Sequence, residues 1–239
     1  MGFLSTCTGS VLVQEYVHMP SKNIVKEYIE NGYYHIYNRG VEKRNIFIDE
    51  QDYSVFLSYL QRSLIKNDDK NKKINRNGYT PKEISEDIDL VAYCLMPNHF
   101  HLLVRQNNER AITSLMKCIA TSYSMYFNKK YHRVGGLFQG RYKAILIKSD
   151  QYLSYLSAYI HLNPVSIKQD PINYNYSSCD YYLKGKKAEW LKIDDILDYF
   201  NGDVSKYKKF LEENNNNLGG ILGDLTLEDA QGPSLCKAV

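Results

Sequence analysis

Apolar and polar positions follow a β-strand pattern in three stretches of the chain. Residues 33–38 (YYHIYN) alternate and predict a first strand. Residues 90–105 (LVAYCLMPNHFHLLVR) hold two apolar runs on either side of Pro97 and Asn98, which form a turn signal. They predict two antiparallel strands joined in a tight hairpin. Residues 142–147 supply a fourth strand.

Three other stretches repeat apolar positions at helical spacing. Asp49 is a suitable N-cap for a first helix, whose apolar stripe can cover one side of a sheet. Residues 111–131 predict a second helix. Residues 152–165 (YLSYLSAYIHLNPV) predict a third, which Pro164 ends because its ring disfavours helical backbone at the preceding residue.

The order of these elements is β-α-β-β-α-β followed by another helix. It predicts an α+β protein with a ferredoxin-like fold, in which helices lie on one face of an antiparallel sheet. Residues 66–85 are polar and predict a long connection before the hairpin. Residues 190–200 and 204–211 predict two short helices, so we expect a small, mostly helical C-terminal extension.

With 239 residues, 44% of them hydrophobic, the chain suits one globular domain and a smaller appendage. We expect an N-terminal extension over residues 1–30, the main domain over 31–165 and the helical extension over 166–213. Residues 214–239, rich in asparagine and glycine, are expected to form a flexible tail.

The net charge of +3 is too small to indicate a nucleic-acid partner on its own, but the charges are unevenly distributed. Residues 129–148 hold no acidic side chain and six basic ones, Lys129, Lys130, Arg133, Arg141, Lys143 and Lys148. A phosphate backbone would prefer this region, and a solvated basic loop is the alternative. The five cysteines lack metal-binding or redox spacing, and no apolar run reaches eighteen residues. We therefore expect reduced cysteines, no membrane span and a cytoplasmic location.

His99 and His101 open the second strand of the hairpin. Side chains in a strand alternate between faces, so the two imidazoles project from the same face and could bind one ion. The alternative is two polar side chains on the solvated face of a half-buried sheet. His35 lies on the first strand, and a lone strand histidine usually belongs to the core or the surface.

Tyr159 and Asn163 lie one turn apart on the third predicted helix. If this helix packs beside the histidine strand, a phenol and an amide oxygen reach the ion that the imidazoles hold. The alternative is that the tyrosines of this helix serve the core and that Asn163 ends the helix. Tyr152 and Tyr155 are the other candidates for a nucleophile on this helix.

Four motifs occur in order along the chain, YHIYNRG (34–40), MPNHFHLL (96–103), LFQGRYKAILI (137–147) and YIHLNPV (159–165). Together they resemble the REP-associated tyrosine transposases, which belong to the IS200-like, single-tyrosine HUH transposases. The resemblance covers about residues 33–165 and implies the same ferredoxin-like fold. The residues around Met19 look like a typical start for this family, so Met19 is an alternative translation start, which the intact mass of the native protein would decide.

The resemblance implies that Tyr159 attacks single-stranded DNA, becomes linked to the 5′ phosphate and leaves a free 3′ hydroxyl. The phosphotyrosine preserves a phosphodiester, so a later attack by a 3′ hydroxyl can rejoin strands without a nucleoside triphosphate. The predicted activity is therefore a metal-dependent DNA transposase that cleaves and rejoins DNA at hairpin-forming repeats.

The resemblance also implies the ligands and the DNA contacts. Asn163 stands where relatives carry a Gln or Asn that completes a metal site with His99 and His101. A divalent metal is expected, Mg²⁺ or Mn²⁺ in use, although Zn²⁺, Co²⁺ or Ni²⁺ would also bind such ligands. Three basic residues within the motifs are predicted to contact DNA: Arg39, Arg141 and Lys143.

Two other functions fit parts of this pattern. A relaxase or replication-initiator-like nickase uses the same metal chemistry, but the single candidate tyrosine and the YIHLNPV motif argue against it. The second alternative is a domesticated protein that binds DNA hairpins without transposing them. Both histidines, Tyr159 and Asn163 are present, so the sequence gives this alternative no support. We expect a monomer associated with the bacterial nucleoid, and a homodimer is the alternative.

Overall fold

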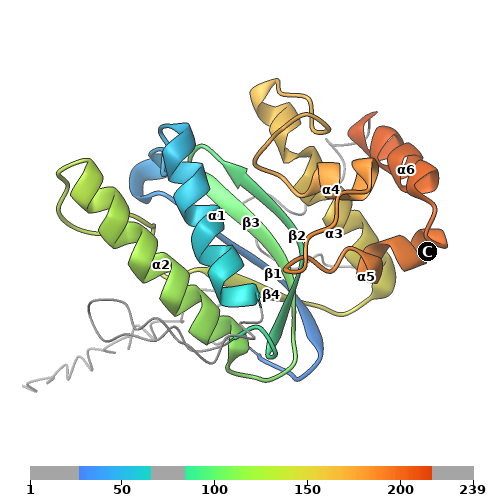
Figure 1. Cartoon of the computed structure of the whole chain (residues 1–239), viewed down its shortest axis with the longest axis horizontal. Coiled ribbons are helices and arrows are strands. Elements are labelled where there is room, and N and C mark those ends of the chain that lie inside the picture. The colour runs from blue at the N-terminus through green and yellow to red at the C-terminus, as the bar shows by residue number, and fades with distance from the viewer. Residues whose placement is uncertain (1–26, 66–83, 217–239) are drawn as a thin grey trace, which may run out of the picture.

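A four-stranded antiparallel sheet lies at the centre of the computed structural model, which describes residues 27–65 and 84–216 (Figure 1). Its strands, in the spatial order β2-β3-β1-β4, are β1 (Gly32–Arg39), β2 (Ile88–Met96), β3 (His99–Gln106) and β4 (Lys143–Ile147). The elements follow one another as β-α-β-β-α-β, so the predicted ferredoxin-like fold is confirmed. The hairpin turns at Pro97 and Asn98, as the sequence predicted.

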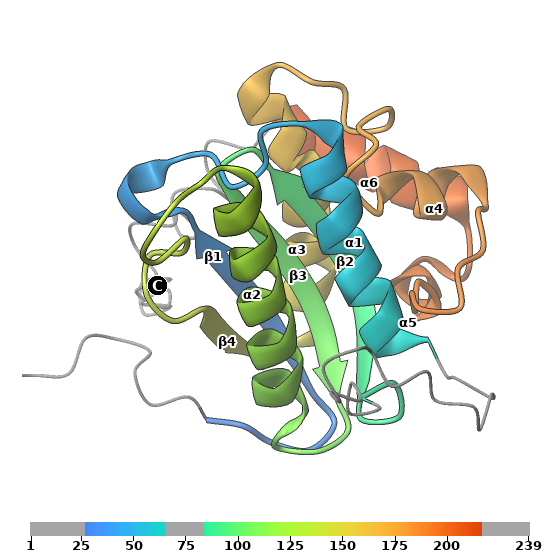
Figure 2. The same cartoon turned by 60° about the vertical axis from the view of Figure 1, so that its left-hand side comes forward.

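One face of the sheet is covered by α1 (Glu50–Leu64) and α2 (Ala111–Lys130), which run side by side in Figure 2. α1 begins with a capping box, because Asp49 and Asp52 each accept a hydrogen bond from the other's backbone N–H. Buried apolar side chains from the strands and both helices form one continuous cluster, which includes Tyr34, Ile36, Phe56, Phe100, Leu102, Leu115 and Tyr123.

The opposite face of the sheet is covered by α3 (Asp150–Leu162) and by the C-terminal segments. These segments are η2 (Asn163–Ile167), α4 (Cys179–Lys184), α5 (Asp194–Leu197), η3 (Asp198–Phe200) and α6 (Val204–Asn216). The expected one-sided arrangement therefore holds only for α1 and α2. The reason is visible in β2, whose sequence IDLVAYCLM is apolar on both faces, so that both faces need cover.

The C-terminal segments are bonded to the sheet as well as packed on it. The hydroxyl of Tyr182 donates to the Val91 carbonyl at 2.8 Å, and that of Tyr174 donates to the Leu95 carbonyl at 2.7 Å. These bonds pair the buried tyrosine hydroxyls with carbonyl oxygens of β2, so neither group is left without a partner inside the apolar layer. The extension is thus continuous with the core that supports α3.

A buried polar cluster joins α3 to α6. His161 of α3 lies between the Tyr207 hydroxyl, 2.7 Å from its Nδ1, and the Ser178 hydroxyl, 2.8 Å from its Nε2. Ser157 adds a contact of 3.1 Å to the same Tyr207 hydroxyl. Because all these groups are buried, the cluster fixes the rotation and height of α3 over the sheet.

Some sequence predictions fall on residues outside the described ranges, namely 1–26, 66–83 and 217–239. Met19, most of the N-terminal extension and most of the predicted tail are among them. α6 ends at Asn216, beyond the boundary expected at residue 213. Within the described residues, the cysteines Cys94, Cys118 and Cys179 are free, and no helix is long and apolar enough to cross a membrane.

Candidate active site

The strand register brings the two predicted histidines beneath α3. His101 pairs with Tyr37 of β1, and Tyr37 pairs with Lys143 of β4, so these side chains form one row across the sheet. Arg39 pairs with His99 in the next row of the same face. The ring of Tyr159 stands edge-on to that of His101, with 5.3 Å between centroids. The predicted shared face of His99 and His101, and its position beside Tyr159, are both found.

His101 is fully buried and is held by a third histidine. Its Nδ1 lies 2.8 Å from Nε2 of His35, and the two rings stack with 5.1 Å between centroids. The other nitrogen of His101, Nε2, is buried without a hydrogen-bond partner in the structure, and so is Nδ1 of His35. An unpartnered buried nitrogen is costly unless a further group binds it, so both nitrogens are open to a further group.

His99 and Asn163 complete the group. Asn163 follows α3 directly, and its Nδ2 donates to the Tyr159 carbonyl at 2.9 Å, which aims its Oδ1 toward His99 Nε2 at 3.5 Å. That separation is at the outer limit of a hydrogen bond. His99 Nδ1 lies 2.6 Å from Oδ1 of Asn98, and this contact orients the His99 ring through the nitrogen that does not face Asn163. The arrangement leaves an imidazole nitrogen and an amide oxygen facing each other.

The residues present fit a divalent metal of mixed nitrogen and oxygen coordination. Two imidazoles and one amide oxygen converge, and one of these imidazole nitrogens has no other partner among the residues that the structure describes. Among the described residues, no three His, Cys, Asp or Glu side chains gather into an all-protein metal cage. A site with so few protein ligands leaves positions for water and phosphate oxygens, as Mg²⁺ and Mn²⁺ require in phosphoryl transfer.

Tyr159 is the tyrosine of α3 that reaches this group. Its side chain is buried on the histidine side of the helix, with 5% exposed. Tyr155 instead packs on Phe210 of α6, with 5.3 Å between ring centroids. Tyr152 packs at the edge of a second apolar cluster, which is formed by α3, the C-terminal segments and the sheet face that they cover. Burial raises the pKa of Tyr159 to about 12, while the Asn163 side chain acts in the opposite direction. The phenol is therefore protonated at neutral pH.

Burial keeps the histidines of this region neutral. It lowers the pKa of His99 to about 4, the pKa values of His35 and His161 to about 3, and that of His101 well below its ordinary 6.5. Neutral imidazole is the form that binds metals. The imidazoles therefore stay uncharged over the whole neutral range of pH.

These buried histidines predict that the metal-free protein loses stability in mild acid. In the unfolded chain each histidine takes up a proton near pH 6.5, whereas the folded state does so only near pH 3 to 4. The stability they contribute is present above pH 6.5 and is lost as the pH falls toward 3, by up to about 1.4 kcal/mol per pH unit for each histidine. Urea unfolding in chelator should show a lower midpoint at pH 5 than at pH 7. Equal midpoints would contradict the buried, neutral state of these rings.

The structure separates the three predicted DNA contacts. Arg39 and Lys143 line a cavity of about 250 Å³ together with Tyr37, whose ring lies 5.9 Å from that of His101. This cavity adjoins the histidines at the β4 edge. Arg141 lies at a different cavity, beneath α2.

Sequence reasoning gave too little weight to His35, which holds His101, and did not single out Tyr37. The alternation of YYHIYN did place both on one face of β1. The pairing of β1 with β3 decides which residues of β3 they contact. This pairing joins residues about 65 positions apart in sequence, such as Tyr37 and His101, so alternation within one strand cannot specify it.

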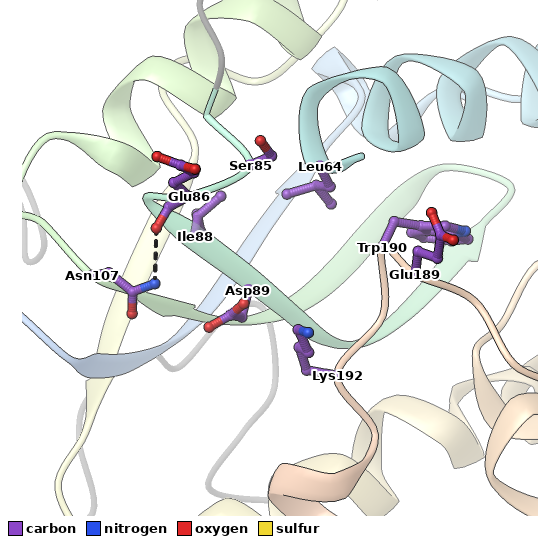
Figure 3. A pocket seen from close by; sticks show the side chains of 9 residues that line it. All are labelled: Leu64, Ser85, Glu86, Ile88, Asp89, Asn107, Glu189, Trp190 and Lys192. Carbon is purple, nitrogen blue, oxygen red and sulfur yellow. Dashed lines mark hydrogen bonds between the residues drawn. The ribbon is translucent and has the colours of Figure 1, made fainter. Parts of the chain in front are cut away.

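Another cavity, of about 450 Å³, lies at the far end of the hairpin (Figure 3). Its polar lining includes Glu86, Asp89, Glu189 and Lys192, and Asn107 donates to the Glu86 carbonyl there. Figure 3 shows these side chains spread around the rim without converging on one point. The cavity adjoins the start of β2, whereas His99 lies at the opposite end of the hairpin, so it is separate from the histidine site.

Comparison with known proteins finds a family-model match in the central part of the chain. Residues 53–163 match the family model described as transposase IS200-like. No curated protein matches the sequence. The matched range begins within α1 and ends at Asn163, so it contains both histidines, Tyr159 and Asn163.

Several solved structures are similar to this chain, and two of them have low sequence identity to it. One is a REP-associated tyrosine transposase bound to a REP hairpin, with 12% identity, a TM-score of 0.45 and coverage of 70% of this chain and 88% of that chain. The other is described as a candidate transposase from Deinococcus radiodurans R1, with 18% identity, a TM-score of 0.34 and coverage of 57% and 93%. Both TM-scores lie below 0.5, so neither likeness bears on the site.

Proposed function

We propose that this chain, whose residues 53–163 match the IS200-like transposase family model, cleaves and rejoins single-stranded DNA at hairpin-forming repeats through Tyr159. The observation that carries the proposal is the convergence of Tyr159, His99, His101 and Asn163 at one point on the sheet. Two of these groups come from a β-hairpin and two from the end of α3. Such a convergence of a nucleophile with open metal ligands suits attack on a phosphodiester.

The proposed step is an in-line displacement at phosphorus. The Tyr159 oxygen forms a bond to the scissile phosphorus, and the bond from phosphorus to the 3′ oxygen breaks. The phenolic proton leaves to solvent, and the departing 3′ oxygen gains a proton to become a hydroxyl. The number of phosphoester bonds is unchanged, so attack of a 3′ hydroxyl on the phosphotyrosine reverses the step and joins strands.

Each protein group has a part in this step. His99, His101 and Asn163 would hold a divalent cation, Mg²⁺ or Mn²⁺, which when bound withdraws charge from the phosphate and favours the phenolate. Asn163 also ties the cation position to the nucleophile, because its amide nitrogen donates to the Tyr159 carbonyl. Burial of the Tyr159 ring holds the hydroxyl in place and prevents rotation away from the site.

All the residues of the proposed site come from one chain. Tyr159 approaches the histidines of its own sheet, and α3 is fixed there by the buried His161 cluster. This supports action as a monomer. Arg39 and Lys143, at the adjoining cavity, would bind the DNA backbone leading to the scissile phosphate.

The direct test is incubation with labelled single-stranded oligonucleotides that carry a hairpin and a single-stranded flank. With Mn²⁺, a covalent protein–DNA band should appear on a denaturing gel and should be absent with chelator. The same sequence as a full duplex should give no band. Tight hairpin binding without any covalent band would contradict the proposal and would favour a domesticated binding protein.

A further inference from the structure

The cavity that Arg141 lines lies on the sheet face covered by α2, between α2 and the segment that precedes β4. It has a volume of about 430 Å³, within the range of ligand sites, which is about 300–1,000 Å³. One wall is a helical stripe of α2 that includes Thr113, Lys117 and Ala120. The opposite wall is formed by Phe138 and Tyr142, together with Arg141. We call it the α2 pocket.

The α2 pocket is preformed. Asn38 of β1 donates to the Gly140 carbonyl at 3.2 Å, and the Gln139 backbone N–H donates to the Arg39 carbonyl at 2.8 Å. Gly140 has φ +72°, a conformation that glycine adopts without strain, and the resulting turn places Arg141 at the pocket. The Tyr142 hydroxyl is also held, 2.7 Å from that of Tyr28.

The charge of the lining favours an anionic ligand with a flat ring. Lys117 and Arg141 form no ion pair or hydrogen bond within the described part of the chain, and none of the described lining residues carries a carboxylate. Aromatic side chains stand beside these cations. Single-stranded nucleic acids are bound by this combination, in which bases stack on aromatic rings while cations contact the phosphates.

The α2 pocket also adjoins the cavity next to the candidate active site. Asn38 lines both the α2 pocket and the cavity that holds Arg39 and Lys143 beside the histidines. β4 is the edge strand of the sheet, and no strand of the described residues lies beyond it. A strand of DNA can therefore leave the site, pass the β4 edge and reach the face beneath α2.

We propose that the α2 pocket binds one unpaired nucleotide of the single-stranded flank, with its base in the aromatic pocket and its phosphate at Lys117 and Arg141. This inference rests on the proposed function, because it needs single-stranded DNA at the Tyr159 site. It assigns Arg141 to a contact away from the scissile phosphate. It also gives the protein a place to read one flanking base.

The test is a scan of the flank with one abasic site at a time, with dissociation constants measured by fluorescence anisotropy at fixed salt. In the unmodified protein, one position should weaken binding about tenfold when its base is removed. Ala120→Phe fills the pocket, so it should weaken binding of the intact oligonucleotide by a similar factor and abolish the further effect of that abasic site. Thr113→Trp, at an exposed position of the same stripe, should act in the same way.

Lys129→Ala is the matched control, because Lys129 is an exposed cation of α2 that does not line the pocket. It should leave the abasic effect unchanged. Equal abasic effects in the unmodified protein and in both pocket variants would overturn the inference, as would equal losses on a hairpin without a flank. The Tyr159 adduct, assayed in parallel, separates the two proposals: an adduct without this coupling defeats only the pocket assignment.

Discussion

Tyr159→Phe is expected to lower formation of the covalent protein–DNA adduct by on the order of a thousandfold or more, since it removes the oxygen that would bond to phosphorus. The aromatic ring remains, so its edge-on packing against His101 and its burial should be retained. Hairpin binding should therefore change little. The measurement is single-turnover adduct yield on a denaturing gel, with binding measured separately.

Tyr155→Phe is the matched control, because it removes a hydroxyl from the same helix on the side that packs against α6. It should keep the full adduct yield. Tyr152→Phe, at the edge of the second apolar cluster, should do the same. An adduct that persists in Tyr159→Phe and disappears in one of these variants would move the nucleophile to that residue.

The elements of this fold could be predicted from the sequence because they depend on local patterns. Strand alternation, the Pro97–Asn98 turn and the Asp49 cap each act over a few residues, and each is found where predicted. The position of the C-terminal segments could not be predicted, because no local pattern states which sheet face they cover. The apolar content of β2 on both faces was the one signal that a second layer exists.

In the candidate site, too, local patterns could be predicted from the sequence and long-range placement could not. His99 and His101 share a face by simple alternation, and Tyr159 and Asn163 share a helix surface by spacing. Arg141, in contrast, was grouped with Lys143, two residues later, although the two lie at different cavities. Lys143 lies within β4, while Arg141 precedes the strand and follows the positive-φ turn at Gly140. Pairing with Tyr37 fixes Lys143 on the sheet face that holds the histidines, whereas Arg141 lies outside the paired residues and lines the cavity beneath α2.

His35→Phe is expected to weaken Mn²⁺ binding in the presence of hairpin DNA by about 10–100-fold, the usual effect of losing a group that orients a metal ligand. The reason lies in the proton of the bond between His35 and His101. If His101 Nδ1 donates to His35 Nε2, the proton of His101 is on Nδ1, and Nε2 has a free lone pair for a cation. If His35 donates instead, His101 Nε2 carries a proton and cannot bind metal. Metal binding therefore requires His35 as the acceptor.

Two measurements test this arrangement, and only the first depends on DNA. The free Mn²⁺ signal in electron paramagnetic resonance gives the affinity, and His35→Gln should restore much of it because a side-chain carbonyl can also accept from His101. Nitrogen-15 NMR of the imidazoles, with Mg²⁺ as the diamagnetic ion, should show the His101 proton on Nδ1. A proton on Nε2 would mean that the buried nitrogen without a partner is a donor, and the ligand set assigned to this site would then be wrong.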